Sequence, residues 1–196
     1  VISEDERYLN VLNNLGITYS FLGNVRKSED YFNKGVDLAN SFHSHLSFNF
    51  INSRAIYLAN HGKIDQGGKL LFETLRYTEK IYGGSTDEYL IVLKNYAEYL
   101  RGFSVDLERS LIYYKLCYDF SRINESSIDL REPILLGYAN SLTANGEYDK
   151  ALAVLQELLN AGTSMSTDGS IIDNPDINDL IPDYRTLNIL KTKHLA

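Results

Sequence analysis

The chain has 196 residues, of which 44% are hydrophobic and 23% are charged, with a formal net charge of −7 and a pI near 5.1. This acidic balance excludes the clustered Lys and Arg of a nucleic-acid footprint and is unsuited to docking on anionic membranes. No run of residues approaches the ~20 apolar positions that a membrane helix needs, and the single cysteine, Cys117, excludes an internal disulfide.

The chain begins with Val1, in a segment that already predicts helix, so we interpret it as a fragment or a processed product. The absence of a signal peptide carries little information in that case. A lone cysteine is compatible with a reducing compartment, and we expect the chain to be cytoplasmic.

Amphipathic periodicity predicts eight helices arranged as four successive pairs. The first helices of the pairs are expected at 5–22, 46–60, 87–101 and 131–144, and the second helices at 25–41, 64–82, 107–123 and 148–160. The pairs therefore span about 5–41, 46–82, 87–123 and 131–160. Residues 161–178 are rich in Ser, Thr, Gly and Asp and predict a flexible loop. Residues 179–196 predict one more helix, which either caps the core or begins a further repeat.

The four pairs share one sequence frame, which is the signature of an internal repeat. A small residue marks the same point in each first helix, at separations of 39 (55−16), 42 (97−55) and 42 (139−97): Gly16, Ala55, Ala97 and Ala139. A second small residue follows in each second helix: Ser28, Gly67, Ser110 and Ala151. The third pair has one extra residue between these two points, in its turn around 103–106. Small side chains at both points predict that the two helices cross closely in an antiparallel hairpin, and that stacked hairpins share a core.

The turns and helix ends agree with this hairpin pattern. Gly23, Gly62 and Gly146 stand where a helix C-terminus favours left-handed backbone. The segment Ser85-Thr86-Asp87-Glu88 predicts a capping box at the start of the third pair.

The repeat frame also carries a family resemblance. Its four copies are Leu12-x2-Leu15-Gly16-x2-Tyr19, Ile51-x2-Arg54-Ala55-x2-Leu58, Leu93-x2-Tyr96-Ala97-x2-Leu100 and Leu135-x2-Tyr138-Ala139-x2-Leu142. The frame resembles the tetratricopeptide repeat (TPR), whose standard unit is about 34 residues. The longer units here, with segments such as Ile81-Tyr82-Gly83-Gly84, resemble the subclass found in kinesin light chains and many bacterial regulators. The resemblance implies an all-α fold, a right-handed superhelical solenoid of four stacked TPR hairpins at 1–160 plus a C-terminal helix.

No arrangement of residues predicts catalysis, and we expect no catalytic residue, cofactor or metal. His43 and His45 are two residues apart and do not share a helical face, and no HExxH or CxxC motif occurs. Cys117 follows Tyr114 by three residues on a packed face, which predicts a buried structural thiol. The Gly67-Gly68 and Gly83-Gly84 pairs lack the spacing of a phosphate loop.

The candidate binding site is a polar row on the first helices, which the TPR resemblance places on the concave face of the solenoid. Its predicted groove residues are Asn10, Asn13, Asn14, Ile17, Asn49, Asn52, Ser53, Lys94, Asn95, Glu98, Arg101 and Asn140. An Asn amide offers both a donor and an acceptor, so a row of them can pair with the main chain of an extended peptide. Kinesin-light-chain-like arrays use such an asparagine ladder, which the resemblance extends to Asn14 and Asn95. The alternative is that these asparagines are merely exposed, or bond between helices, in a chain rich in Asn throughout.

One known TPR binding mode is disfavoured by the sequence. Chaperone-binding TPR domains hold a C-terminal carboxylate in a clamp of basic residues, whereas Asn13 occupies the expected first lysine position here. Only Lys94 and Arg101 are basic along the predicted row.

The function we predict is a protein-interaction scaffold that binds a partner peptide or helix in the concave groove. Two alternatives stay open: a regulatory or sensor segment of a larger signalling protein, such as a kinase, protease-like or transcription-factor fusion, and a homotypic module that self-associates through its terminal repeats. The expected partners are proteins or peptides, without nucleic acid and without membrane insertion.

Overall fold

The computed structural model describes residues 4–41, 45–84, 86–123 and 128–163. All regular structure in these ranges is helical: α1 (Glu4–Phe21), α2 (Val25–Ser41), α3 (His45–Asn60), α4 (Ile64–Tyr82), α5 (Asp87–Tyr99), the π-helical turn η1 (Leu100–Ser104), α6 (Leu107–Ile123), α7 (Ile128–Ala144) and α8 (Tyr148–Thr163). The chain divides into two compact units, Val1–Asp106 and Leu107–Ala196, at a point inside the third predicted repeat.

The helix ends differ from the predicted positions by at most three residues, as at the start of α7 (128 against 131) and the end of α8 (163 against 160). Residues 161–163, expected in a loop, therefore belong to a helix. The rest of the predicted loop and the predicted helix at 179–196 lie outside the described residues.

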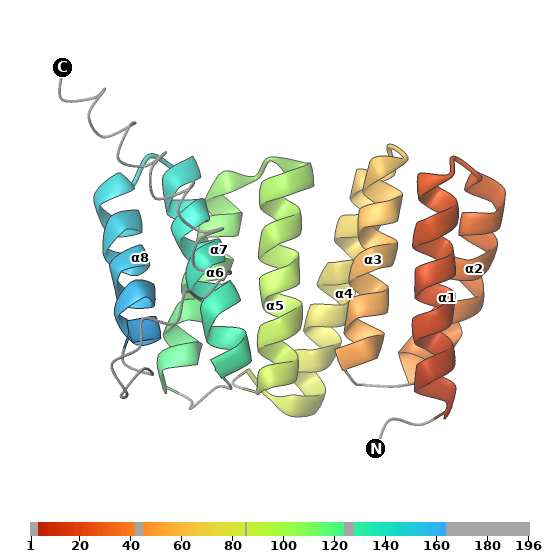
Figure 1. Cartoon of the computed structure of the whole chain (residues 1–196), viewed down its shortest axis with the longest axis horizontal. Helices are drawn as coiled ribbons and strands as arrows, with labels where there is room; N and C mark the ends of the chain where they lie inside the picture. Colours follow the sequence, from red (N-terminus) through yellow and green to blue (C-terminus); the bar gives the residue numbers. More distant parts are fainter. Residues whose placement is uncertain (1–3, 42–44, 85, 124–127, 164–196) are drawn as a thin grey trace. The chain divides into compact units, whose positions relative to one another are not determined.

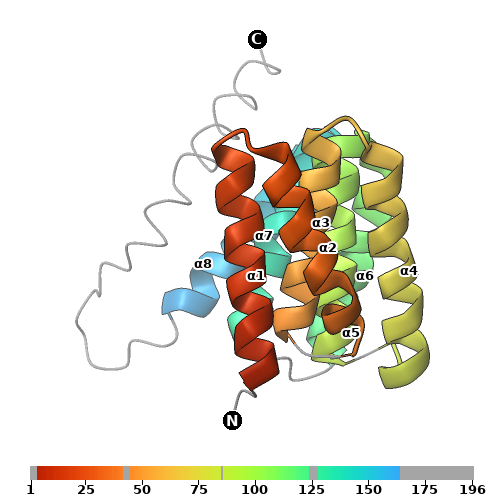
Figure 2. The ribbon, with the colours of Figure 1, turned by 90° about the vertical axis from the view of Figure 1, so that its right-hand side faces the viewer.

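The first unit consists of two layers of helices. Helices α1, α3 and α5 follow one another in contact and form one layer, and α2 and α4 form the other (Figure 1). Each second helix also packs against the next first helix, α2 against α3 and α4 against α5. The hairpin of α1 and α2 lies at one end of this unit, nearest the viewer in Figure 2. Stacking therefore buries the apolar face that a single hairpin would leave exposed.

The small residues of the repeat frame lie at the helix crossings, as the sequence predicts. The Ser28 hydroxyl donates a hydrogen bond of 2.7 Å to the carbonyl oxygen of Gly16, which joins α2 to α1. A Cβ atom on Gly67 of α4 would lie only 2.6 Å from the carbonyl oxygen of Ala55 on α3. A larger side chain would collide with the ring of Phe32 at Gly16 and with the backbone of α3 at Gly67.

The extra residue of the third pair is accommodated in η1. Widening the last turn of α5 to a π-helix absorbs one additional residue without breaking the helix. Val105 then ends the turn in the left-handed region, with φ 52°, and the backbone N–H of Asp106 donates to the carbonyl of Leu100 at 3.0 Å. The ring of Phe103 packs against Tyr99, with centroids 5.1 Å apart.

The predicted turn glycines are confirmed, and the predicted capping box is wrong in its register. Gly23, Gly62 and Gly146 have φ values of 71°, 77° and 79°. Thr86, rather than Ser85, is the N-cap of α5, and its side chain accepts a 3.4 Å hydrogen bond from the backbone N–H of Tyr89. The third residue of the helix is thus a tyrosine, which cannot return the reciprocal bond that a glutamate makes in a capping box.

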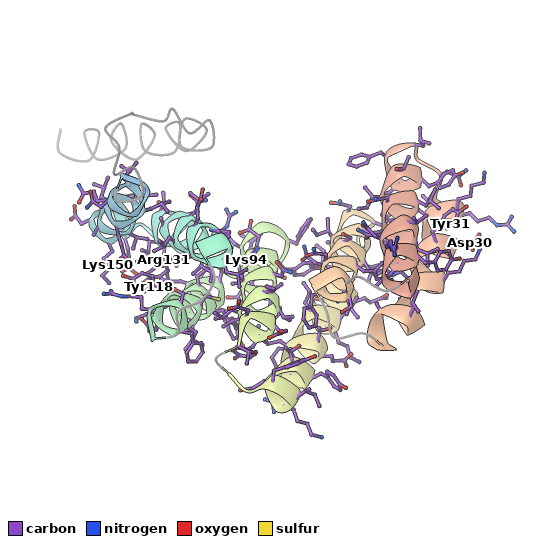
Figure 3. All side chains as sticks on the ribbon, turned by 60° about the horizontal axis from the view of Figure 1, so that its bottom comes forward. Asp30, Tyr31, Lys94, Tyr118, Arg131 and Lys150 are labelled. Atoms are coloured by element: carbon purple, nitrogen blue, oxygen red, sulfur yellow. The ribbon has the colours of Figure 1, made fainter. Side chains whose placement is uncertain are left out.

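In the second unit, α7 packs against both α6 and α8. Gly137 is buried on α7 where a Cβ atom would lie 2.5 Å from Cζ of Tyr114 on α6. The Tyr118 hydroxyl donates to Glu157 of α8 at 2.7 Å, and Arg131 of α7 donates to the same carboxylate at 3.1 Å. Figure 3 labels Tyr118 and Arg131, which come to this carboxylate from α6 and α7 (Figure 3). One buried aromatic contact and one polar cluster therefore join the three helices.

Alkaline pH should destabilise the fold because its packed tyrosines resist ionisation. Burial is the largest cause that raises the pKa of five tyrosines above 10.0: Tyr57, Tyr82, Tyr99, Tyr118 and Tyr138. A folded pKa above the unfolded one means that the folded state holds the proton more tightly. The contribution of these tyrosines to the free energy of unfolding should therefore be constant below about pH 9 and fall as the pH rises through and beyond 10. Urea titrations at pH 8 and pH 11 check this; equal midpoints would contradict it.

Candidate functional site

The predicted polar row has its best-exposed members on α1 and α3. Asn10 and Asn14 of α1 and Asn49 of α3 are exposed, and the two helices pack side by side. The remaining row residues on these helices are half-buried: Asn13, Ile17, Asn52 and Ser53. Their spacing along each helix, at i, i+3, i+4, places them on one face. The first unit therefore presents amide side chains from two neighbouring helices of one layer.

Two half-buried members of the row differ in their hydrogen bonding. The Oδ1 atom of Asn13 is buried and has no hydrogen-bond donor among the described residues. The Ser53 hydroxyl donates to the carbonyl of Asn49 within its own helix, at 2.9 Å. The amide of Asn13 thus keeps unused hydrogen-bonding capacity, whereas the donor of Ser53 is already occupied.

On α5 the row is less accessible. Asn95 is buried, with 7% of its surface exposed. Lys94, labelled in Figure 3, is half-buried, as are Glu98 and Arg101. Arg101 is engaged with Glu98, to which its Nε donates at 3.3 Å. In the second unit, Asn140 is half-buried on α7.

A second surface feature of the first unit was not found by sequence reasoning. An open hollow of about 340 Å³ lies on α2, α3 and α4. We name it the outer hollow, and its lining residues are Val36, Arg54, Leu58, Gln66, Lys69, Leu70 and Glu73. The visible signal was Arg54, which stands in the repeat frame where the other units have Leu15, Tyr96 and Tyr138.

Arg54 is half-buried and makes no ion pair within the described residues. Its Nη2 donates to Oδ1 of Asn33 at 2.9 Å, and its Nη1 is buried without a hydrogen-bond partner. The guanidinium lies 5.5 Å from the ring centroids of both Phe32 and Tyr57, as a cation–π contact. Burial lowers the pKa of Arg54, and the charge of Glu29 opposes that shift.

The nearby acid is committed to another cation. Lys63 donates to Glu29 at 3.0 Å, and this bond is the largest cause that lowers the pKa of Glu29. Lys69 and Glu73, at the rim of the outer hollow, pair with each other at 3.7 Å and are both well exposed. Arg54 is therefore the cation of the hollow whose charge no carboxylate pairs within the described residues.

The described part of the chain is also informative about metal sites, membrane-spanning helices and exposed cysteine. No group of three or more His, Cys, Asp or Glu there could hold a metal ion, and no helix there has the length and apolarity to cross a membrane. Cys117 is buried, with 0% of its surface exposed, as the sequence predicts.

Comparisons with known proteins find one matching repeat family and several similar solved structures. A family model for the tetratricopeptide repeat matches residues 9–42. The structure of BtubC (BKLC) from P. vanneervenii is similar, with a TM-score of 0.65 and 13% identity over 86% of this chain and 68% of that chain. The nearly identical TPR-like repeats of a putative kinesin light chain from Podosopora anserina give a TM-score of 0.64 and 11% identity, over 96% of this chain and 98% of theirs.

A variant form of the same Podosopora anserina repeats also gives a TM-score of 0.64 and 11% identity, over 98% of this chain and 100% of that one. No curated protein matches the sequence of this chain. Structures at such low identity are informative about the fold alone, and the fold they share with this chain is the TPR solenoid. Such repeats generally mediate protein–protein interaction and are typically non-catalytic. The predicted all-α class is confirmed, and residues 9–42 of this chain match the tetratricopeptide repeat.

Proposed function

We propose that the layer formed by α1, α3 and α5 binds an extended peptide segment of a partner protein. The observation that carries the proposal is the set of exposed amides Asn10, Asn14 and Asn49 on two helices that pack side by side. An exposed Asn amide can donate to a peptide carbonyl and accept from a peptide N–H at the same time.

Two further observations support this use of the layer. The buried Oδ1 of Asn13 lacks a donor among the described residues, so its amide has bonding capacity next to the exposed asparagines. Ile17 is half-buried on the same face of α1 and supplies apolar surface beside the amides. Main-chain recognition by amides with side-chain contacts alongside is the chemistry of a peptide groove.

Alanine at Asn14 and Asn49 should weaken peptide binding. Each substitution removes an amide that contributes about 1 kcal/mol through hydrogen bonds, so each single variant should bind about fivefold more weakly and the double variant more than tenfold. The ligand is a peptide selected from a random display library against the full chain, and its affinity is measured by calorimetry.

Asn60→Ala is the matched control, because Asn60 is an exposed asparagine at the end of α3, outside the row. We expect its affinity to stay within about twofold of the unaltered chain. Unchanged binding in the double variant, with circular dichroism showing that it is folded, would remove the groove proposal.

Self-association is the second candidate, favoured by one specific observation. Tyr8 and Val11 expose 55% and 52% of their surfaces on α1, the outer first helix of the first unit. Exposed apolar side chains on a repeat hairpin are suited to stacking against another copy. Light scattering over a concentration range separates the two candidates, since a peptide binder keeps a constant mass and a self-stacking chain does not.

A further inference from the structure

The outer hollow combines apolar walls with one cation, Arg54, that forms no ion pair among the described residues. Val36, Leu58 and Leu70 supply aliphatic surface from three helices. The rim pair Lys69 and Glu73 is mutually neutral, so the charge of Arg54 dominates the hollow. Withdrawing a charge from water without pairing it is unfavourable, and such groups are normally hydrogen-bonded to an opposite charge.

Arg54 also departs from the repeat in a way that opens this space. At the next stacking step, the equivalent residue Tyr96 packs against Phe72 with ring centroids 5.6 Å apart. One repeat earlier, where Arg54 stands in place of Tyr96, Asn33 stands in place of Phe72. Asn33 lies five residues after the small residue Ser28, as Phe72 lies five residues after the small residue Gly67. An aromatic pair is thus replaced by the polar pair Arg54 and Asn33, which bond at 2.9 Å. A local departure from a repeat rule without a gain in packing points to a functional position.

The guanidinium is held ready for a planar anion. It lies over Phe32 and Tyr57, which limit its freedom, and only one of its five N–H donors is used in a hydrogen bond among the described residues. A carboxylate matches the fork of an arginine with two parallel hydrogen bonds. The aliphatic walls favour apolar side chains on either side of that carboxylate.

We propose that the outer hollow is a second docking surface, which takes a partner peptide carrying an Asp or Glu side chain between aliphatic residues. The surface is distinct from the asparagine row. Arg54 and Asn52 are two residues apart on α3, and about 200° of helical rotation separates their side chains. An acidic peptide in the outer hollow and a peptide on the row can therefore bind to one molecule together.

The test uses two peptides that differ at one side chain, which is a carboxylate in one peptide and an amide in the other. Both are ten residues long, acetylated and amidated, with Leu-Asp-Leu or Leu-Asn-Leu at the centre and Gly and Ser elsewhere, so the only carboxylate is the Asp side chain. Each is titrated into the full chain labelled with 15N, and amide shifts in the NMR spectrum give both affinity and location. The Asp peptide should bind at least about tenfold more tightly at low salt, with shifts centred on Val36, Leu58 and Leu70.

Variants assign that preference to one residue. In Arg54→Gln the two peptides should bind equally, and in Arg54→Lys, which keeps the charge but loses the fork, the preference should be intermediate. Arg76→Gln is the matched control, because Arg76 is an exposed arginine of α4 outside the hollow, and it should keep the full preference. Equal binding of the two peptides to the unaltered chain, binding of neither, or shifts centred on the asparagine row would each overturn the proposal. Because the first comparison needs no variant, it stands even where Arg54→Gln fails to fold.

Discussion

Replacing Phe32 with alanine should lower the free energy of unfolding of the first unit by about 3–5 kcal/mol. The Phe32 side chain has 0% of its surface exposed. Its ring centroid lies 5.9 Å from that of Phe50 and 4.9 Å from that of Tyr57, and a Cβ atom on Gly16 would lie 3.0 Å from its ring. One side chain thus fills the space between α1, α2 and α3. Its removal leaves a cavity that three rigid helices cannot close.

The measurement is urea unfolding followed by circular dichroism, with a separate transition allowed for each compact unit because repeat arrays need not unfold in one step. Phe21→Ala is the control, since Phe21 is 88% exposed at the end of α1. This variant should change stability by no more than about 0.5 kcal/mol. Similar losses in both variants would show that burial of Phe32 is not what stabilises the first hairpin.

Gly67→Ala should destabilise the first unit by about 1–3 kcal/mol, although alanine is the better helix former. The added Cβ atom would lie 2.6 Å from the carbonyl oxygen of Ala55 and would also collide with the hydroxyl of Tyr99. The carbonyl belongs to the backbone of α3 and cannot turn aside. The Tyr99 hydroxyl donates to the carbonyl of Ile64 at 2.7 Å, and moving it would break that bond.

The neighbouring glycine provides a control of opposite sign. A Cβ atom on Gly68 would meet its nearest neighbour, Cε1 of Tyr99, at 3.4 Å, an ordinary van der Waals distance. Gly68→Ala should therefore gain up to about 1 kcal/mol from helix propensity alone. Thermal unfolding of the two variants distinguishes the effects, and a rise in Tm for Gly67→Ala would contradict the close crossing of α3 and α4.

Much of the fold was predictable from the sequence because its determinants are local. Helical periodicity, the turn glycines Gly23, Gly62 and Gly146, and the small residues Gly16 and Gly67 each depend on a few neighbouring positions. The extra residue of the third pair was equally visible as a change in spacing. The sequence did not predict that the π-helical turn η1 accommodates this residue, because an added residue can be absorbed either in a turn or in a helix.

The exposure of the polar row on the first helices was not predictable residue by residue. Asn14 and Asn95 occupy the same place in the repeat frame, yet Asn14 is exposed and Asn95 is buried. Gly137, at the same place on α7, packs against Tyr114. A frame position fixes the direction of a side chain from its helix, whereas its exposure depends on what neighbouring elements place beside it.

The sequence by itself determined which residues form helices, where the hairpins turn and which small residues let them cross. Only the tertiary structure decided which polar side chains keep unused hydrogen-bonding groups. Arg54 is one of 19 Lys and Arg residues in the sequence. Arg54 differs from the others because its half-buried guanidinium lies over two aromatic rings and its Nη1 forms no hydrogen bond within the described part of the chain. The described residues of α2 and α4 around it do not pair it to a carboxylate. Charge pairing is a property of contacts between elements, which no local pattern records.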